Sequence, residues 1–286
     1  MNILITGAGS GIGAELARAL AGDGHSLIIC GRRRSRLREI AESGGSISFM
    51  KCDVSDEKQV AKFRKYAEKR FEFLDVIINN AGVFGAIGRF DMTDSKSWKK
   101  AFEINTFGTY LVTKYFLGLL LKSGTKKIIN FAGGGAFNAF PNYSSYAVSK
   151  AAVVRFTENI AAELKGSGVK VNCIAPGFVA TGLHESTLKA GEKLAGEQYR
   201  HTMEKISKGS TPVGIPVSCI KFLISDESGP LTGKTISANF DKWGSDVFNS
   251  SIDEISSSDL YTMRRINIVN LDGNDNLKKK LNEIQK

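Results

Sequence analysis

Residues 2–21 read N-I-L-I-T-G-A-G-S-G-I-G-A-E-L-A-R-A-L-A and indicate the fold class of the chain. The apolar beginning of this stretch predicts a buried strand, and its later period predicts a helix. Between them, Gly7 allows a tight turn, Gly11 lets the backbone approach a phosphate, and Gly13 lets helix and strand pack closely. The free amides at the start of such a helix can hold a pyrophosphate. A glycine-rich turn without a ligand is the competing interpretation.

Strand and helix patterns alternate along the rest of the chain. Strands are predicted at residues 2–6, 26–30, 46–50, 74–78, 128–131, 169–174 and 235–238. Helices are predicted at residues 14–21, 36–42, 57–71 and 97–121, and from Tyr146 to Glu163. Because strands alternate with helices from the first residue, the sequence predicts an α/β fold with one doubly wound parallel sheet.

Polar residues follow several predicted strands at their carboxyl ends, where an open α/β sheet binds its ligands. At the end of the second strand, where an acidic residue would bind the ribose of NAD, the chain has Gly31 and then Arg32. Arg32, and with it Arg33, could bind a 2′-phosphate. The alternative is the exposed first turn of a helix, which we favour for Arg34. Asp53 could accept a hydrogen bond from adenine or cap the next helix.

The segment from residue 127 to residue 152 carries a candidate catalytic pair. Tyr146 and Lys150 are four residues apart and share one helix face. A nearby ammonium favours the phenolate and lowers a tyrosine pKa that is ordinarily about 10, so Tyr146 is a candidate general acid or base. A core tyrosine and a solvated lysine would give the same pattern. Asn105, within a predicted helix, is either a hydrogen-bonded core residue or part of a site.

Composition narrows the possible partners. The chain has 286 residues, of which 42% are hydrophobic, and its net charge of +10 favours anionic ligands such as nucleotides. We expect no nucleic-acid binding, because no arginine-rich tract alternates with aromatic residues. The four cysteines are dispersed, predicting free thiols, and neither they nor the three histidines form a metal-ligand pattern. A strand follows Met1 directly, and the apolar segment 110–121 is too short to span a bilayer, so we expect a cytoplasmic protein.

Taken together, the motifs resemble those of the short-chain dehydrogenase/reductase family. They are T-G-A-G-S-G-I-G (6–13), N-N-A-G (79–82), I-N-T-F-G (104–108), Y-A-V-S-K (146–150) and P-G-F-V-A-T (176–181). The resemblance covers residues 1–240, which would form a single Rossmann-type domain, with residues 241–286 as a C-terminal extension. It implies hydride transfer between a nicotinamide and a carbonyl or alcohol. It also implies a homodimer or homotetramer that packs the helices around residues 97–121 and 147–165. Arg32 makes NADP(H) the preferred cofactor, with NAD(H) as the alternative.

The resemblance also assigns roles to single residues. Tyr146 matches the family's proton donor or acceptor. Lys150 matches the lysine that lowers the pKa of that tyrosine and binds the nicotinamide ribose. Asn105 matches the asparagine that holds a water in the proton relay. Besides Tyr146 and Lys150, the positions implied in cofactor binding are Gly7, Ser10, Gly11, Ile12, Gly13, Arg32, Asp53, Val54, Asn80, Ala81, Pro176, Gly177, Val179 and Thr181.

One position departs from the family pattern. The serine that donates a hydrogen bond to the substrate oxygen, about thirteen residues before the tyrosine, is Gly133 here. Losing such a donor costs about 10²- to 10³-fold in rate. The amides of residues 133–135 could replace it, or a bulkier substrate could bring its own hydroxyls; Ser144 and Ser145 lie too near Tyr146 to be assumed substitutes. We expect an enzyme, and the alternative is a dinucleotide-binding regulatory or scaffold protein with weakened catalysis.

Two segments lie outside these motifs. Residues 181–214 predict amphipathic helices, and the resemblance implies that they form a lid over the substrate. Their basic composition fits an anionic small-molecule substrate, although a solvated surface gives the same pattern. In the extension, Trp243 and residues 266–271 predict docking on the body. Residues 252–271 could cover the substrate pocket or a neighbouring subunit, and residues 274–286 predict a surface helix or a frayed end.

Overall fold

The structure is a computed structural model that describes residues 1–264. Its centre is a seven-stranded parallel sheet in the order β3-β2-β1-β4-β5-β6-β7. The strands are β1 (Asn2–Thr6), β2 (Ser26–Gly31), β3 (Ser46–Lys51), β4 (Val76–Asn79), β5 (Lys127–Phe131), β6 (Lys170–Ala175) and β7 (Thr235–Ser237). The predicted Rossmann-type, doubly wound sheet in a single domain is confirmed, and strand bounds differ from the predicted ones by about one or two residues.

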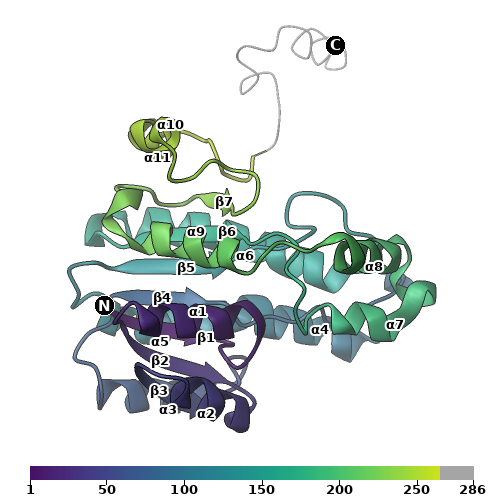
Figure 1. Cartoon of the computed structure of the whole chain (residues 1–286), viewed down its shortest axis with the longest axis horizontal. Coiled ribbons are helices and arrows are strands. Elements are labelled where there is room, and N and C mark those ends of the chain that lie inside the picture. Colours follow the sequence, from purple (N-terminus) through teal and green to yellow (C-terminus); the bar gives the residue numbers. More distant parts are fainter. Residues whose placement is uncertain (265–286) are drawn as a thin grey trace, which may run out of the picture.

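Helices cover both faces of the sheet (Figure 1). They are α1 (Gly11–Gly22), α2 (Arg34–Glu42), α3 (Glu57–Glu68), α4 (Ser95–Phe102), α5 (Gly108–Leu120), α6 (Ser144–Glu163), α7 (Glu185–Ala195), α8 (Glu197–Lys208), α9 (Gly214–Ile224), α10 (Asp246–Ser250) and α11 (Ile252–Ser257). Short turns of 3₁₀ helix are η1 (Phe90–Met92), η3 (Lys165–Ser167) and η4 (Asp226–Ser228), and η2 (Glu103–Phe107) is π-helical. Within residues 1–264, no helix is both long and apolar enough to cross a bilayer.

Strand β1 shows how the two faces are filled. Ile3 and Ile5 point into a cluster with residues of α1, α2 and α9, and Leu4 points into a cluster with residues of α3, α5 and α6. All three side chains are fully buried, which explains the continuous apolar run in the sequence. The strand order reverses between β1 and β4, and ligands of such folds bind beyond the carboxyl ends of the strands at this point.

The helix predicted over residues 97–121 differs from the observed structure. Helices α4 and α5 are separated by η2, a π-helical turn that contains Asn105. A π turn inserts an extra residue into a helix and often occurs at functional sites. The helix predicted to end at Phe71 ends at Glu68 instead.

The chain beyond β7 packs along the outer edge of that strand. The main-chain N–H of Thr235 donates to the carbonyl of Tyr261 at 2.8 Å, and that of Ser237 donates to the carboxylate of Asp241 at 2.6 Å. An edge strand whose amides already have acceptors is a poor template for pairing with another sheet. The described part of the extension therefore completes the domain.

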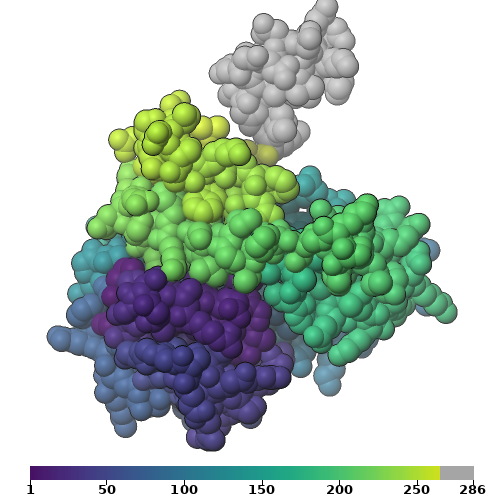
Figure 2. Space-filling view, viewed as in Figure 1, coloured from purple at the N-terminus to yellow at the C-terminus, as the bar shows by residue number. Residues whose placement is uncertain are grey.

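Aromatic residues fasten this segment to α9. The rings of Trp243 and Phe248 lie 6.0 and 5.9 Å from that of Phe222, which confirms the predicted docking of Trp243. Helix α11 also packs here, beside β7, whereas α7 and α8 form a separate lobe (Figures 1 and 2). Among residues 252–264, Ile252 and Ile255 are buried in the cluster that contains residues of α9, and Met263 packs against the cluster of Ala132 and Ala136. The interpretation that this segment covers the substrate pocket or a neighbouring subunit stays a prediction.

The remaining predictions for the extension concern residues 266–271 and 274–286. Both ranges lie outside the described residues.

Replacing Phe248 by alanine should lower the free energy of unfolding by about 3–5 kcal/mol, because a buried aromatic ring leaves a cavity. The neighbouring Val247 is 77% exposed, so Val247→Ala should change it by less than about 0.5 kcal/mol. Urea unfolding of both variants measures the two values. If both variants lowered the free energy of unfolding by the same small amount, the extension would not be part of the folded domain.

Candidate active site

The carboxyl ends of β1 and β4 are held together by hydrogen bonds. The side-chain amide of Asn80 donates to the carbonyl of Thr6 at 2.9 Å, and the main-chain N–H of Ala81 donates to the hydroxyl of Thr6 at 3.1 Å. A Cβ atom at Gly7, where φ is +67°, would lie 2.7 Å from the Cα of Ala81, and one at Gly13 would overlap the Asn80 amide. Both glycines are therefore needed for this close approach. This agrees with the predicted tight turn at Gly7 and the predicted close packing of helix and strand at Gly13.

The start of α1 has the features of an anion site. Ser10 is the N-cap in an extended conformation, and its side chain makes no capping hydrogen bond. In the described residues, the main-chain amides of Gly11, Ile12 and Gly13 have no acceptor. Unpaired amides and the helix dipole favour a negative group at this end. The predicted cradle for a pyrophosphate therefore fits the structure.

The predicted contacts of the adenosine half lie at the ends of β2 and β3. Arg32 is exposed and enters none of the ion pairs among residues 1–264. Helix α2 begins at Arg34, as predicted for that residue. The interpretation of Asp53 as a helix cap is wrong, because Asp56 caps α3. Asp53 instead accepts hydrogen bonds from the amide and hydroxyl of Ser55, at 3.1 and 2.7 Å.

Val54, predicted to contact the cofactor, is buried. A Cβ atom at Gly108 would lie 2.6 Å from Cγ2 of Val54. This residue therefore packs the end of β3 against the start of α5.

The loop after β6 crosses the end of β1. At Gly177 φ is +78°, and a Cβ atom there would overlap the side-chain amide of Asn239. Val179 is buried, and a Cβ atom at Gly11 would lie 3.2 Å from Thr181. The segment that begins at Pro176 and was predicted to contact the nicotinamide therefore reaches the glycine turn.

Tyr146 and Lys150 lie on one face of α6, and both side chains are buried. The Lys150 ammonium is 5.8 Å from the centre of the Tyr146 ring and donates to the carbonyl of Phe131 at 2.8 Å. Burial raises the pKa of Tyr146 and lowers that of Lys150 to about 8. The predicted lowering of the Tyr146 pKa is wrong for this arrangement, because the loss of hydration of the phenolate outweighs the distant ammonium.

Asn105 is buried, and its side chain is fully hydrogen-bonded. Its oxygen accepts from the amide of Val83 at 2.8 Å, and its nitrogen donates to the carbonyl of Val83 at 2.9 Å and to the hydroxyl of Ser149 at 2.8 Å. Ser149 in turn donates to the carbonyl of Tyr146 at 2.7 Å. The π turn thus locks the loop after β4 to the helix that carries Tyr146. The sequence analysis did not single out Ser149 or Val83, although both lie in or beside motifs.

Comparison with known proteins agrees with this arrangement. The model of the family described as short chain dehydrogenase matches residues 1–191. The chain belongs to the short-chain dehydrogenase family. Members of this family are oxidoreductases that bind a nicotinamide dinucleotide, so the predicted resemblance is confirmed.

Relatives of this short-chain dehydrogenase include dehydrogenase/reductase SDR family member 4 of Rattus norvegicus, which is 30% identical over 82% of this chain and 84% of its own length. A putative ketoacyl reductase of Streptomyces coelicolor is 35% identical over 62% of this chain and 70% of its own. Among solved structures, actinorhodin polyketide ketoreductase with NADPH has a TM-score of 0.76, is 28% identical, and is matched over 82% of this chain and 94% of its own. The structure of levodione reductase has a TM-score of 0.74, is 28% identical, and is matched over 82% of this chain and 95% of its own.

In this short-chain dehydrogenase, the glycine at position 133 is in direct contact with Tyr146. A Cβ atom at Gly133 would overlap the Tyr146 hydroxyl oxygen, so the phenol fills the space of the missing side chain. Ser144 accepts a hydrogen bond from the indole of Trp98 at 2.9 Å, and Ser145 donates to the carbonyl of Phe84 at 3.1 Å. Neither serine therefore substitutes for the missing one.

Aromatic side chains surround the Tyr146 ring. Phe84 meets it edge-on at 4.8 Å between ring centres, and Phe140 lies at 6.4 Å. His184, in the lid, lies 5.5 Å from Phe84 and stacks on Phe178 at 4.0 Å, and burial lowers its pKa to about 4. Sequence reasoning missed these contacts, because the residues come from separate loops and, apart from Phe178 in the 176–181 motif, belong to none of the motifs.

The basic residues of the lid are exposed. Three of them pair with carboxylates of the lid itself (Lys189 with Glu185, Arg200 with Glu192, Lys208 with Glu204), and His201 lies edge-on to Phe178 at 6.1 Å between ring centres. These pairs fit a solvated surface, and the anionic substrate stays a prediction.

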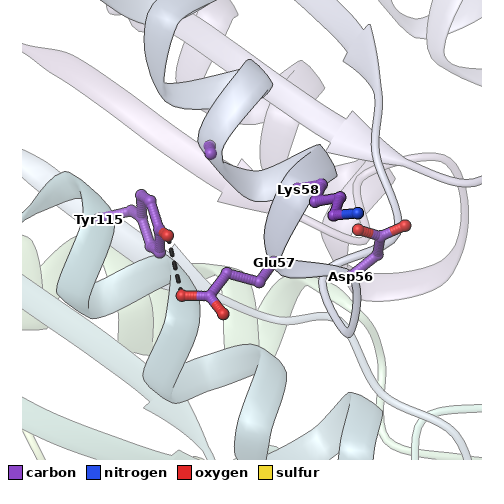
Figure 3. Close-up of a pocket in the computed structure, with 5 residues that line it drawn as sticks. Asp56, Glu57, Lys58 and Tyr115 are labelled. Atoms are coloured by element: carbon purple, nitrogen blue, oxygen red, sulfur yellow. Dashed lines mark hydrogen bonds between the residues drawn. The ribbon is translucent and has the colours of Figure 1, made fainter.

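A hollow of about 600 Å³ lies elsewhere, along α3 and α5 (Figure 3). Its lining residues are Asp56, Glu57, Lys58, Ala61 and Tyr115, and the hydroxyl of Tyr115 donates to Glu57 at 2.8 Å. None of these residues belongs to the predicted site. The buried titratable pair, Tyr146 and Lys150, lies instead at the carboxyl end of β5, where Lys150 donates to the carbonyl of Phe131.

The pKa of Lys150 predicts a pH dependence of stability. Between about pH 8 and 10.5 the unfolded chain keeps this proton and the folded chain does not, so stability should rise with pH by about 1.4 kcal/mol per unit. Below pH 8 both states are charged, and the contribution is constant. Urea unfolding of wild type and Lys150→Met at several pH values isolates this effect. The free energy of unfolding of the wild type should increase relative to that of Lys150→Met as pH rises. A difference between the two that stays constant with pH would contradict the lowered pKa of Lys150.

Proposed function

We propose that the chain is an NADP(H)-preferring reductase of small carbonyl compounds in the cytoplasm. One observation carries the proposal: the buried pair Tyr146 and Lys150 lies at the same end of the sheet as the unpaired amides of α1. A dinucleotide held by those amides would extend past Thr181 toward Tyr146.

Each residue then has a chemical task. The amides of Gly11 to Gly13 would hold the pyrophosphate, Thr181 the carboxamide, and Lys150 the nicotinamide ribose. The nicotinamide, when bound, supplies the hydride. Burial keeps Tyr146 protonated at neutral pH, because it raises the pKa of the phenol. A protonated hydroxyl suits the proton donor of a reduction, which delivers its proton to the substrate oxygen.

The substrate that fits best is an uncharged ketone with a ring. Any molecule that reaches the Tyr146 hydroxyl has to lie beside Phe84 and Phe140, which offer flat apolar contacts. The ketoreductases among the relatives support a ketone substrate. The anionic substrate suggested by the composition of the lid is the alternative substrate class.

We also propose a homodimer or homotetramer. Phe102, Phe107 and Tyr110 expose 37 to 41% of their surface along α4, η2 and α5, and Val148 on α6 is 47% exposed. Apolar residues gathered on adjacent helices are typical of a protein interface.

The alternative is a dinucleotide-binding regulatory or scaffold protein with weakened catalysis. The observation in its favour is Gly133, since the usual side-chain donor is missing. The next experiment separates the two functions.

Tyr146→Phe should abolish NADPH-dependent ketone reduction and leave the affinity for NADPH nearly unchanged, because only the proton donor is removed. Tyr115→Phe is the matched control: it removes a hydrogen-bonded hydroxyl on the outer side of α5 and should keep full turnover. Steady-state rates and calorimetric titration give the two readouts. Turnover retained by Tyr146→Phe would refute its role, and a wild type that binds NADPH without reducing any ketone would favour the scaffold.

Arg32→Ala should weaken NADPH binding about tenfold or more and leave NADH binding unchanged, because a charge-assisted contact to the 2′-phosphate contributes about 1.5–3 kcal/mol. Arg38→Ala, an exposed residue later in α2, is the control and should affect neither. Calorimetric titration with both nucleotides measures the effects. Tighter binding of NADH than of NADPH by the wild type would overturn the cofactor preference.

A further inference from the structure

We infer that the main-chain amide of Gly134 takes the place of the missing serine hydroxyl and donates a hydrogen bond to the substrate oxygen. This inference rests on the proposed function as a carbonyl reductase. It names the group that polarises the carbonyl while Tyr146 supplies the proton.

The amide lies in a tight turn directly after β5. The N–H of Ala136 donates to the carbonyl of Gly133 at 3.2 Å, which closes a four-residue turn. Gly135, at the third position, has a φ of +83°, whereas Gly134 is not among the residues with positive φ. This is the pattern of a type II turn, in which glycine is favoured at the third position. The turn holds its backbone without help from a side chain.

The amide of Gly134 is available to a ligand. Among the hydrogen bonds of residues 1–264, none uses the N–H of Gly133, Gly134 or Gly135 as donor. Gly134 is exposed, so a ligand can reach its backbone. An amide held in a fixed turn needs no reorganisation when charge develops on the substrate, and this is the condition for effective stabilisation of an oxyanion.

The turn also lies next to the reacting hydroxyl. A Cβ atom at Gly133 would overlap the Tyr146 hydroxyl oxygen, so the backbone of the turn and the phenol are in direct contact. An oxygen that accepts a hydrogen bond from Tyr146 lies about 2.7 Å from the hydroxyl and therefore beside the turn. Gly133 and Gly134 add no side chain of their own to this approach, which Phe140 flanks.

Nearby side-chain donors are committed elsewhere. Ser144 and Ser145 bind Trp98 and the carbonyl of Phe84, and Ser149 lies between Asn105 and the carbonyl of Tyr146. Ser145 and Ser149 would each have to give up a buried hydrogen bond to donate to a substrate, whereas Ser144 accepts from Trp98 through its hydroxyl oxygen. The backbone amide requires no such exchange.

Two substitutions at one position test the inference. Gly134→Pro removes the amide hydrogen, and proline is favoured at the second position of a type II turn, so the fold should be kept. Gly134→Ala keeps the hydrogen, and its Cβ would lie 3.4 Å from the ring of Phe140, within ordinary contact distance. With 2-tetralone as probe and NADPH as reductant, Gly134→Pro should lose about 10²- to 10³-fold in kcat, and Gly134→Ala should stay within about threefold.

The experiment distinguishes failure of this inference from failure of the proposed reductase function. Full activity of Gly134→Pro, with wild type active, overturns this inference and leaves the reductase assignment intact. A wild type that binds NADPH in calorimetric titration but reduces neither 2-tetralone nor simple ketones overturns both.

If Gly134→Pro fails to bind NADPH or to fold, Gly133→Ser decides. We expect a lower kcat for Gly133→Ser, because its Cβ displaces the Tyr146 hydroxyl from a site that already has a donor. A higher kcat would show that the donor was missing, and would overturn the inference.

Discussion

The close approach of the first glycine turn to the end of β4 is the contact on which the site depends. Gly7 and Gly13 leave no room for side chains between α1, β1 and the Asn80–Ala81 segment. This contact brings the unpaired amides of α1 to the point where the strand order reverses. The loop after β6 then reaches the same place through Thr181. A bulkier residue at either glycine would separate parts that have to act on one dinucleotide.

Burial controls the chemistry at the centre of this arrangement. It raises the pKa of Tyr146 and lowers that of Lys150, so at neutral pH the phenol keeps its proton while the lysine can lose one near pH 8. Asn105 and Ser149 fix the helix on which both residues lie. The absence of a side chain at position 133 lets the phenol rest against the backbone. Gly133 thus leaves open the space that the Tyr146 hydroxyl occupies.

The segments outside the motifs divide into two structural roles. The lid, α7 and α8, is a lobe whose charged residues pair with one another at its surface, while His184 and Phe178 contribute to the aromatic surroundings of Tyr146. The extension is fastened to α9 through Trp243 and supplies acceptors to the edge of β7. The lid therefore adds His184 to the aromatic side chains near Tyr146, and the described part of the extension packs on α9 and the edge of β7.

Local sequence was enough to predict the strands, the alternating order and the glycine turn, because the period of buried residues and the conformational freedom of glycine are properties of neighbouring residues. The spacing of Tyr146 and Lys150 likewise placed both on one helix face. Only the tertiary structure decided the direction of their pKa shifts, since these depend on burial by residues far apart in the chain. It also decided that the π turn breaks the helix predicted over residues 97–121, and that aromatic rings surround Tyr146. The cap of α3 is a local contact, because Asp56 accepts from the amide of Gln59 three residues on, and sequence reasoning missed it. The pKa shifts and the aromatic surroundings depend on which distant segments meet, and no local pattern carries that information.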